Sequence, residues 1–118
     1  MVLKSKMIEF SKTVCIETIK PGDGKTYPKK GDTVKINYVG KFQDGRIFAS
    51  TQAGYAFECK IGVGQVIKGW DEGVMKLSLG EQARLTIPPE DAYGSHGFGS
   101  VIGPDSTLIF DIELLGIS

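Results

Sequence analysis

Four segments of the chain alternate apolar and polar side chains with a period of two. One face of each segment is apolar and the other carries charged or amide groups, which is typical of a strand with one buried face. The segments lie at residues 33–42, 57–61, 82–87 and 108–114, and a weaker fifth runs from Val14 to Ile19. The pattern predicts a sheet of four strands and a less certain fifth.

Only one segment repeats apolar residues at the three- and four-residue spacing of a helix. The repeat begins at Val66 or Ile67 and continues through Trp70, Val74 and Leu77. Two glycines within it, Gly69 and Gly73, each cost a helix about 1 kcal/mol relative to alanine. We therefore expect a short helix that depends on packing against the sheet.

Glycine-rich turns separate these segments. The pair Asp44-Gly45 lies between Phe42 and Phe48 and predicts a tight hairpin. Since no repeated helical crossovers join the strands, the fold class is α+β, with an antiparallel sheet and its helix against one face. A long loop at residues 94–106 contains four glycines, yet it also carries apolar side chains that we expect to line a site.

Composition limits the range of functions. The 118 residues are 41% apolar, and 14 basic residues balance 14 acidic ones. This describes one domain and argues against nucleic-acid or membrane binding, because both need concentrated positive charge. The two cysteines, Cys15 and Cys59, are too few for a disulfide scaffold and are expected to be reduced, buried and inert. Residues 1–12 form an extension, either an edge strand or a tail, and contain no signal-length apolar run, so we expect a cytoplasmic protein.

The usual residues for breaking covalent bonds are scarce. His96 is the single histidine and lies in the glycine-rich loop, where we expect it to be solvated. The acidic pair Asp71-Glu72 near the helix start is best explained by the helix dipole. No dinucleotide fingerprint or phosphate loop is present, and we expect neither a cofactor nor a metal.

Aromatic residues are instead concentrated where strands, helix and long loop would meet. Two readings remain open: a purely structural core, or a pocket for an apolar ligand, which favours rigid rings with a few polar groups. The aromatic residues are Tyr38, Phe48, Phe57, Trp70, Tyr93, Phe98 and Phe110.

The order of several long motifs favours the pocket. These are GVGQVIKGWDEG at residues 62–73, GEQARLTIP at 80–88, AYG at 92–94 and TLIFDIELL at 107–115. In this order they resemble the FKBP family of peptidyl-prolyl cis-trans isomerases, which also bind tacrolimus and rapamycin. The resemblance covers about residues 16–115, so we assign residues 13–118 to one isomerase domain. It implies a curved antiparallel sheet wrapped around one short helix.

The resemblance also implies a set of site residues. Trp70 would form the floor of the pocket, and the backbone N–H of Ile67 and the hydroxyl of Tyr93 would bind carbonyl oxygens of a substrate or drug. Residues expected to act in catalysis are Tyr38, Phe48, Ile67, Trp70, Tyr93 and Phe110. Further ligand-binding residues are Phe57 and Val66, together with Phe98, Val101 and Ile102 from the long loop.

Two positions depart from the family pattern. Ala49 follows Phe48 where the family usually has an aspartate that accepts a hydrogen bond from the drugs, and residues 50–56 are about one residue shorter than usual. Gly103 stands where proline is common. We therefore expect Ala49 to weaken macrolide binding more than catalysis.

An isomerase of this kind needs no reactive side chain. The barrier to rotation about an X-Pro bond, about 18–20 kcal/mol, arises from amide resonance, and an apolar pocket favours the less polar twisted state. The leading hypothesis is an active isomerase. Alternatives are a binding module with little turnover, which Ala49 keeps open, and a chaperone-like protein. Expected partners are X-Pro peptides and macrolides and, with drug bound, calcineurin or the TOR kinase; we expect a monomer.

Overall fold

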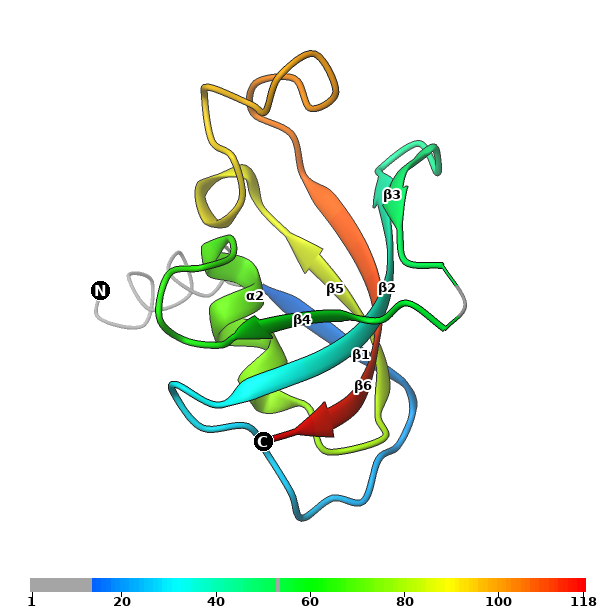
Figure 1. The fold of residues 1–118 in the computed structure, drawn as a ribbon. Coiled ribbons are helices and arrows are strands. Elements are labelled where there is room, and N and C mark those ends of the chain that lie inside the picture. Colours follow the sequence, from blue (N-terminus) through cyan, green and yellow to red (C-terminus); the bar gives the residue numbers. More distant parts are fainter. Residues whose placement is uncertain (1–13, 53) are drawn as a thin grey trace, which may run out of the picture.

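The computed structural model describes residues 14–52 and 54–118, so the extension expected at residues 1–12 lies outside it. Across this part of the chain, a six-stranded antiparallel sheet is the main element (Figure 1). Its strands are β1 (Cys15–Lys20), β2 (Thr33–Phe42), β3 (Ile47–Ser50), β4 (Phe57–Lys60), β5 (Gln82–Ile87) and β6 (Leu108–Ile117). All five strands expected from the alternation are present, and β3 forms the second arm of the hairpin expected around Asp44-Gly45.

The order of strands places β2 and β6 in the middle of the sheet. The order is β1-β5-β6-β2-β3, and β4 also pairs with β2. The strand β2 is therefore flanked by β6 along one edge, while β4 and β3 pair in succession with the other. This change of partner along one edge lets β2 contribute to the wall of a site as well as to the core.

The expected helix is present as α2 (Lys68–Gly73), followed by a 3-10 turn, η1 (Val74–Lys76). Figure 1 shows α2 against one face of the curved sheet. A Cβ atom on Gly69 would lie 2.5 Å from Cγ2 of Ile87, and one on Gly73 would lie 2.6 Å from Cδ2 of Leu85. The glycines that weaken the helix are thus the residues that let it approach β5.

The hydrophobic core lies between the sheet and α2. Alternate residues of β5, and of β6 from Leu108 to Leu114, are buried in it, although Ile109 interrupts the polar side of β6 as its sequence indicates. Its largest fully buried side chains are Val34, Ile36, Ile61, Val74, Leu77, Leu85, Ile87, Leu108 and Leu114. The α+β class, a curved antiparallel sheet with one short helix, is confirmed.

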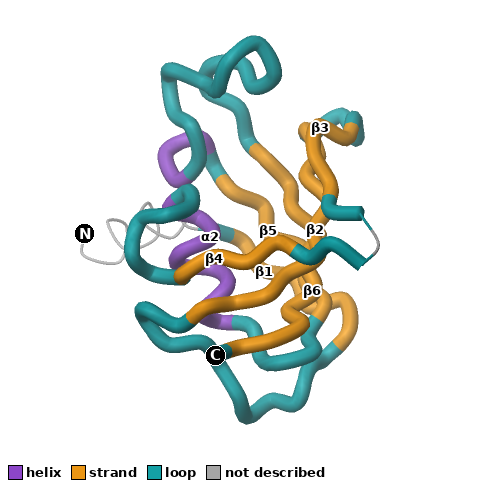
Figure 2. The backbone as a smooth tube through the Cα atoms, viewed as in Figure 1, coloured by secondary structure: helices purple, strands orange, loops and turns teal. Residues whose placement is uncertain are grey.

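Long loops extend beyond the sheet at one end of the molecule (Figure 2). They are the β2–β3 hairpin and the segment between the short 3-10 turn η2 (Pro89–Asp91) and β6. The two come together at a hollow lined by residues of both, including Phe42, Arg46 and Asp105. No helix among residues 14–52 and 54–118 is long and apolar enough to cross a membrane.

Candidate functional site

A cavity of about 620 Å³ opens between the sheet, the start of α2 and the long loop. The structure brings all the sequence-predicted site residues to this one cavity. The cavity volume is also free of the protein's own side chains, so it has room for a ligand. Its lining contains Tyr38, Phe48, Ala49, Phe57, Val66, Ile67, Trp70, Tyr93, Phe98, Val101, Ile102 and Phe110. Gly64 and Gln65, which sequence reasoning missed, also line it. Both belong to the motif at residues 62–73 and directly precede Val66, and this position is the signal that could have found them.

Aromatic rings packed edge to face form the floor and one wall. The ring of Trp70 is 4.9 Å from that of Tyr38 and 5.2 Å from that of Phe110, measured between centroids, and both pairs are nearly perpendicular. Trp70 is only 5% exposed. Its Nε1 is the one buried side-chain nitrogen or oxygen without a hydrogen-bond partner among the described residues. The rings therefore form a rigid surface that presents aromatic faces and edges.

Glycine at position 40 makes room for two of these rings. A Cβ atom there would lie 2.8 Å from Phe48 and 2.9 Å from Phe110. The pairing of β2 with β3 also shifts register between Gly40 and Lys41. A bulge of this kind bends the strand and redirects its side chains. The two phenylalanines consequently approach each other, with centroids 5.6 Å apart.

The opposite wall is a loop that one carboxylate holds in place. Asp71 accepts hydrogen bonds from the N–H groups of Gly62 at 2.8 Å and Gly64 at 2.9 Å. Both glycines have positive φ angles, of 80° and 81°, which side-chain-bearing residues rarely adopt. The expectation that Asp71 serves only the helix dipole is therefore incomplete, because its side chain also fixes the loop. Spacing along the helix does not reveal such a contact.

This loop ends at Ile67, directly before α2. The carbonyl of Ile67 accepts the N–H groups of Trp70 and Asp71, which begins the helix. Among the described residues, the N–H of Ile67 itself has no backbone acceptor. A backbone donor at the edge of an apolar cavity is available to a ligand, because a donor shielded from water needs an acceptor.

Tyr93 supplies a hydroxyl group on the side of the long loop. Its ring packs against Phe98 at 5.1 Å. Burial, with a smaller effect of the nearby Tyr38, raises the pKa of the Tyr93 phenol above its ordinary value of about 10. The hydroxyl is therefore protonated at neutral pH and can donate a hydrogen bond.

The long loop also forms the mouth of the cavity. Phe98 and Ile102 pair through their backbones. Ile102 is 4% exposed and points inward, whereas Phe98 and Val101 are 60% and 55% exposed. The loop thus contributes one buried contact and two apolar side chains at the rim.

The cavity lining contains no carboxylate, imidazole, thiol or amine side chain. His96 is exposed on the loop, as expected. Cys59 is buried, and burial together with the charge of Asp71 raises the pKa of its thiol, which keeps it in the unreactive form. Cys15 was expected to be buried, but it is exposed, because it lies on the outer face of β1. The site can therefore bind and orient a ligand, but its lining lacks the carboxylate, imidazole, thiol and amine groups that most often transfer protons or act as nucleophiles.

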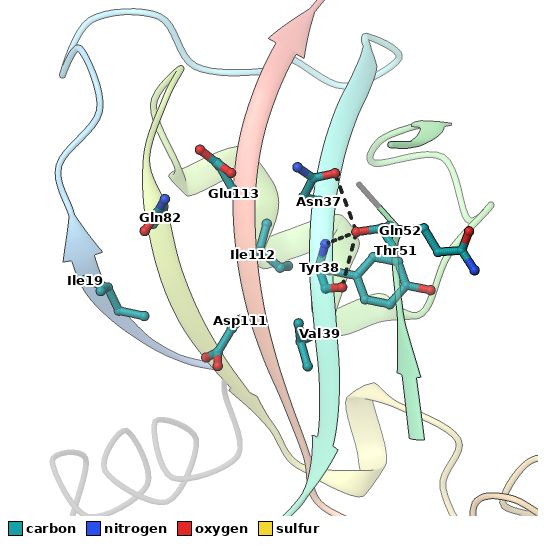
Figure 3. Close-up of a pocket in the computed structure, with 10 residues that line it drawn as sticks. All are labelled: Ile19, Asn37, Tyr38, Val39, Thr51, Gln52, Gln82, Asp111, Ile112 and Glu113. Carbon is teal, nitrogen blue, oxygen red and sulfur yellow. Dashed lines mark hydrogen bonds between the residues drawn. The ribbon is translucent and has the colours of Figure 1, made fainter. Parts of the chain in front are cut away.

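A second hollow, of about 320 Å³, lies on the opposite face of the sheet (Figure 3). Polar side chains such as Asn37, Gln82 and Glu113 line it. In Figure 3 the Thr51 hydroxyl sits beside the backbone of Tyr38, whose N–H donates to it at 3.0 Å. The two hollows thus meet, from opposite faces, at one residue of β2.

The fold and the site together define an α+β protein with one cavity lined mainly by aromatic and aliphatic side chains. Residues 24–115 match the family described as FKBP-type peptidyl-prolyl cis-trans isomerase. The chain is 57% identical to FK506-binding protein 1 of Saccharomyces cerevisiae, over 97% of this chain and 99% of that protein. It is also 57% identical to FK506-binding protein 1 of Candida glabrata, over 89% and 93%. The chain belongs to the FKBP-type peptidyl-prolyl cis-trans isomerase family and is an enzyme of that class.

Proposed function

We propose that the aromatic cavity is the isomerase site and that the proline ring of the substrate lies over Trp70. The observation that carries this proposal is the cavity of about 620 Å³, mainly apolar and without a carboxylate, imidazole, thiol or amine in its lining. A five-membered ring with its two flanking peptide groups fits a space of this size and character.

Rotation in this cavity is favoured by loss of solvent. The planar amide carries partial negative charge on oxygen and partial positive charge on nitrogen, so water stabilises the planar form more than the twisted one. Surrounding the bond with the rings of Tyr38, Phe48 and Phe110 removes that preference and lowers the barrier. Each 1.4 kcal/mol or so of differential stabilisation accelerates the reaction about tenfold.

Hydrogen bonds hold the peptide while the bond turns. The N–H of Ile67 and the hydroxyl of Tyr93 stand at two sides of the cavity and donate to carbonyl oxygens that flank the rotating bond. A donor to the oxygen of the rotating amide itself would stabilise the planar form, because that oxygen loses charge as the bond twists. These two groups therefore contribute mainly to binding and orientation, and Phe57, Val66, Ile102, Val101 and Phe98 add apolar contacts.

The same cavity is proposed to bind tacrolimus (FK506) and rapamycin. Support comes from relatives named for binding FK506 and from the match between a macrolide's apolar ring and this lining. Ala49 places a methyl group in the wall and offers no acceptor, which weakens this binding. We further propose a cytoplasmic monomer whose drug-bound form presents a composite surface to calcineurin or the TOR kinase.

An isomerisation assay on an X-Pro peptide, with protein far below the peptide concentration, tests the proposal. We expect many turnovers per protein molecule, since a binding module that only docks a proline segment gives none. Ala49 is the one feature that favours the binding-module alternative. Tyr27→Ala, which removes a half-exposed ring outside the cavity lining, serves as the control and is expected to keep full activity.

The pH dependence provides a second readout. Because the cavity lining has no carboxylate, imidazole, thiol or amine and the pKa of Tyr93 is raised, we expect kcat/KM to be nearly constant from about pH 6 to 9. A bell-shaped profile centred in that range would contradict a mechanism without proton transfer.

A further inference from the structure

Tyr38 lies where β2 changes its partner strand. Along one edge, β2 pairs with β4 from Thr33 to Ile36 and with β3 from Val39 to Lys41. At the gap between them, the N–H of Tyr38 donates to the hydroxyl of Thr51 at 3.0 Å. The N–H of Thr51 donates to the carbonyl of Tyr38 at 2.9 Å. The N–H of Tyr38 has no backbone acceptor in β3 or β4, and the hydroxyl of Thr51 serves as its acceptor instead.

The Thr51 hydroxyl is itself held on the outer face of the sheet (Figure 3). Its Oγ1 lies 3.4 Å from the carbonyl oxygen of Tyr38 and 3.5 Å from Oδ1 of Asn37, so the hydroxyl can donate to either oxygen. The hydroxyl accepts one hydrogen bond and donates another. Its position is therefore defined by both the backbone and a neighbouring side chain of β2.

On the inner face, the ring of Tyr38 contacts three other aromatic rings of the cavity. Its centroid lies 4.9 Å from that of Trp70, 5.9 Å from that of Phe110 and 6.0 Å from that of Phe57. A small rotation of the backbone at Tyr38 would move the ring against all of them. The backbone bonds made by Thr51 control that rotation.

We propose that Thr51 is a positioning residue for catalysis, which acts through Tyr38 from the opposite face of the sheet. The inference rests on the proposed function of the aromatic cavity. Thr51 is outside the cavity lining. Its hydroxyl keeps the Tyr38 N–H paired and the ring aimed at the floor.

Variants of nearly equal shape test this role. Thr51→Val removes the hydroxyl and keeps the branching, and we expect kcat/KM to fall about three- to tenfold, the equivalent of one lost hydrogen bond. Thr51→Ser restores the acceptor and should retain activity within about twofold. Thr86→Val is the matched control, because it makes the same substitution on β5 at a residue outside the cavity lining. Equal activity of Thr51→Val and wild type would overturn the proposal.

A double-mutant cycle separates positioning from general stability. In a Tyr38→Ala background, adding Thr51→Val should cause no further loss of kcat/KM, because the ring that Thr51 aims is gone. Losses that multiply would show that Thr51 acts independently of Tyr38 and would overturn the proposal. If Thr51→Val does not fold, Thr51→Ala takes its place in the cycle.

A structural readout does not depend on turnover. Trp70 is the only tryptophan, so its fluorescence reports on contact with Tyr38. We expect Thr51→Val to change the emission of Trp70 and to accelerate amide exchange at Tyr38, with neither effect in Thr51→Ser. Failure of the wild type to isomerise peptides would refute the proposed function, whereas unchanged emission and exchange in Thr51→Val would refute the role of Thr51.

Discussion

Removing a ring and removing a hydroxyl from the cavity should have different effects. Phe110 is 4% exposed and its ring packs on those of Tyr38, Phe48 and Trp70. We expect Phe110→Ala or Trp70→Ala to lower kcat/KM by about 10- to 100-fold or more, because each forfeits about 1.5–3 kcal/mol of apolar contact and the shape of the wall. Tyr93→Phe loses one neutral hydrogen bond and should lower kcat/KM about two- to tenfold.

Peptide isomerisation with each purified variant gives the comparison, after a denaturant titration shows that the variant is folded. Large-to-small changes at buried rings cost about 3–5 kcal/mol of stability, so this check is necessary. A complete loss of activity in Tyr93→Phe would contradict the mechanism, since it would assign proton transfer to that hydroxyl.

Ala49 should limit drug affinity more than catalysis. Ala49→Asp adds a charged acceptor to the cavity wall, and we expect tacrolimus to bind more tightly by about 1–3 kcal/mol, with a smaller change in kcat/KM. Ala49→Asn is the control, because it has nearly the same shape without the charge and should give less than the full gain. Calorimetric titration measures the dissociation constant of tacrolimus for both variants. An unchanged dissociation constant for Ala49→Asp would refute the expectation.

At the scale of residues, the sequence predicted which side chains line the cavity better than it predicted which side chains hold the surrounding backbone in place. The twelve predicted residues all reach the cavity because they belong to long motifs whose order is informative. The roles of Thr51 and Asp71 were not predicted from the sequence. Each side chain accepts a hydrogen bond from a backbone N–H that is nine or more residues away, on Tyr38 for Thr51 and on Gly62 for Asp71. Nothing in the spacing of side chains encodes such bonds.

The loop before α2 is tied to that helix by one carboxylate, the side chain of Asp71. Asp71→Ala leaves the N–H groups of Gly62 and Gly64 without their acceptor. We expect kcat/KM to fall about tenfold, because the N–H of Ile67 at the end of the loop loses its fixed position. Asp23→Ala is the control, since Asp23 also accepts two backbone N–H groups, from Lys25 and Thr26, but in a loop outside the cavity lining.

Both variants should lose stability in a denaturant titration, and only Asp71→Ala should lose activity. A parallel loss of activity in the two variants would show that the effect is global, and would remove Asp71 from the site.

At the scale of elements, alternation predicted strands well where one face is buried and the other polar. The strand β3 was expected only as part of a hairpin, because four residues are too few to show a period. The helix was predicted from the spacing of its apolar residues, but the reason for its glycines was not. The glycines are needed because the helix packs closely against Ile87 and Leu85 of β5. Close approach between elements is a property of the folded chain.

One cluster of charges links the three neighbouring strands β5, β6 and β2. The carboxylate of Asp111 on β6 accepts hydrogen bonds from Nε of Arg84 on β5 at 2.7 Å and from Nζ of Lys41 on β2 at 3.0 Å. The Arg84 hydrogen bond, with help from Lys41 and against the effect of burial, holds the pKa of Asp111 below its ordinary value. A carboxylate with a lowered pKa in the folded state stabilises the fold above its unfolded pKa, near 4, and loses this contribution as the pH falls through its folded pKa.

Asp111→Asn should therefore destabilise the protein at pH 7 and have a smaller effect at about pH 2. We expect a loss of about 0.5–1 kcal/mol at neutral pH, because the three side chains are partly exposed and solvent screens the pairs. Urea titrations at the two pH values measure the difference, and Asp44→Asn, which breaks a more exposed pair with Arg46, should show a smaller one. A loss of equal size at both pH values would assign the effect to packing, because only the charged form of Asp111 attracts Arg84 and Lys41.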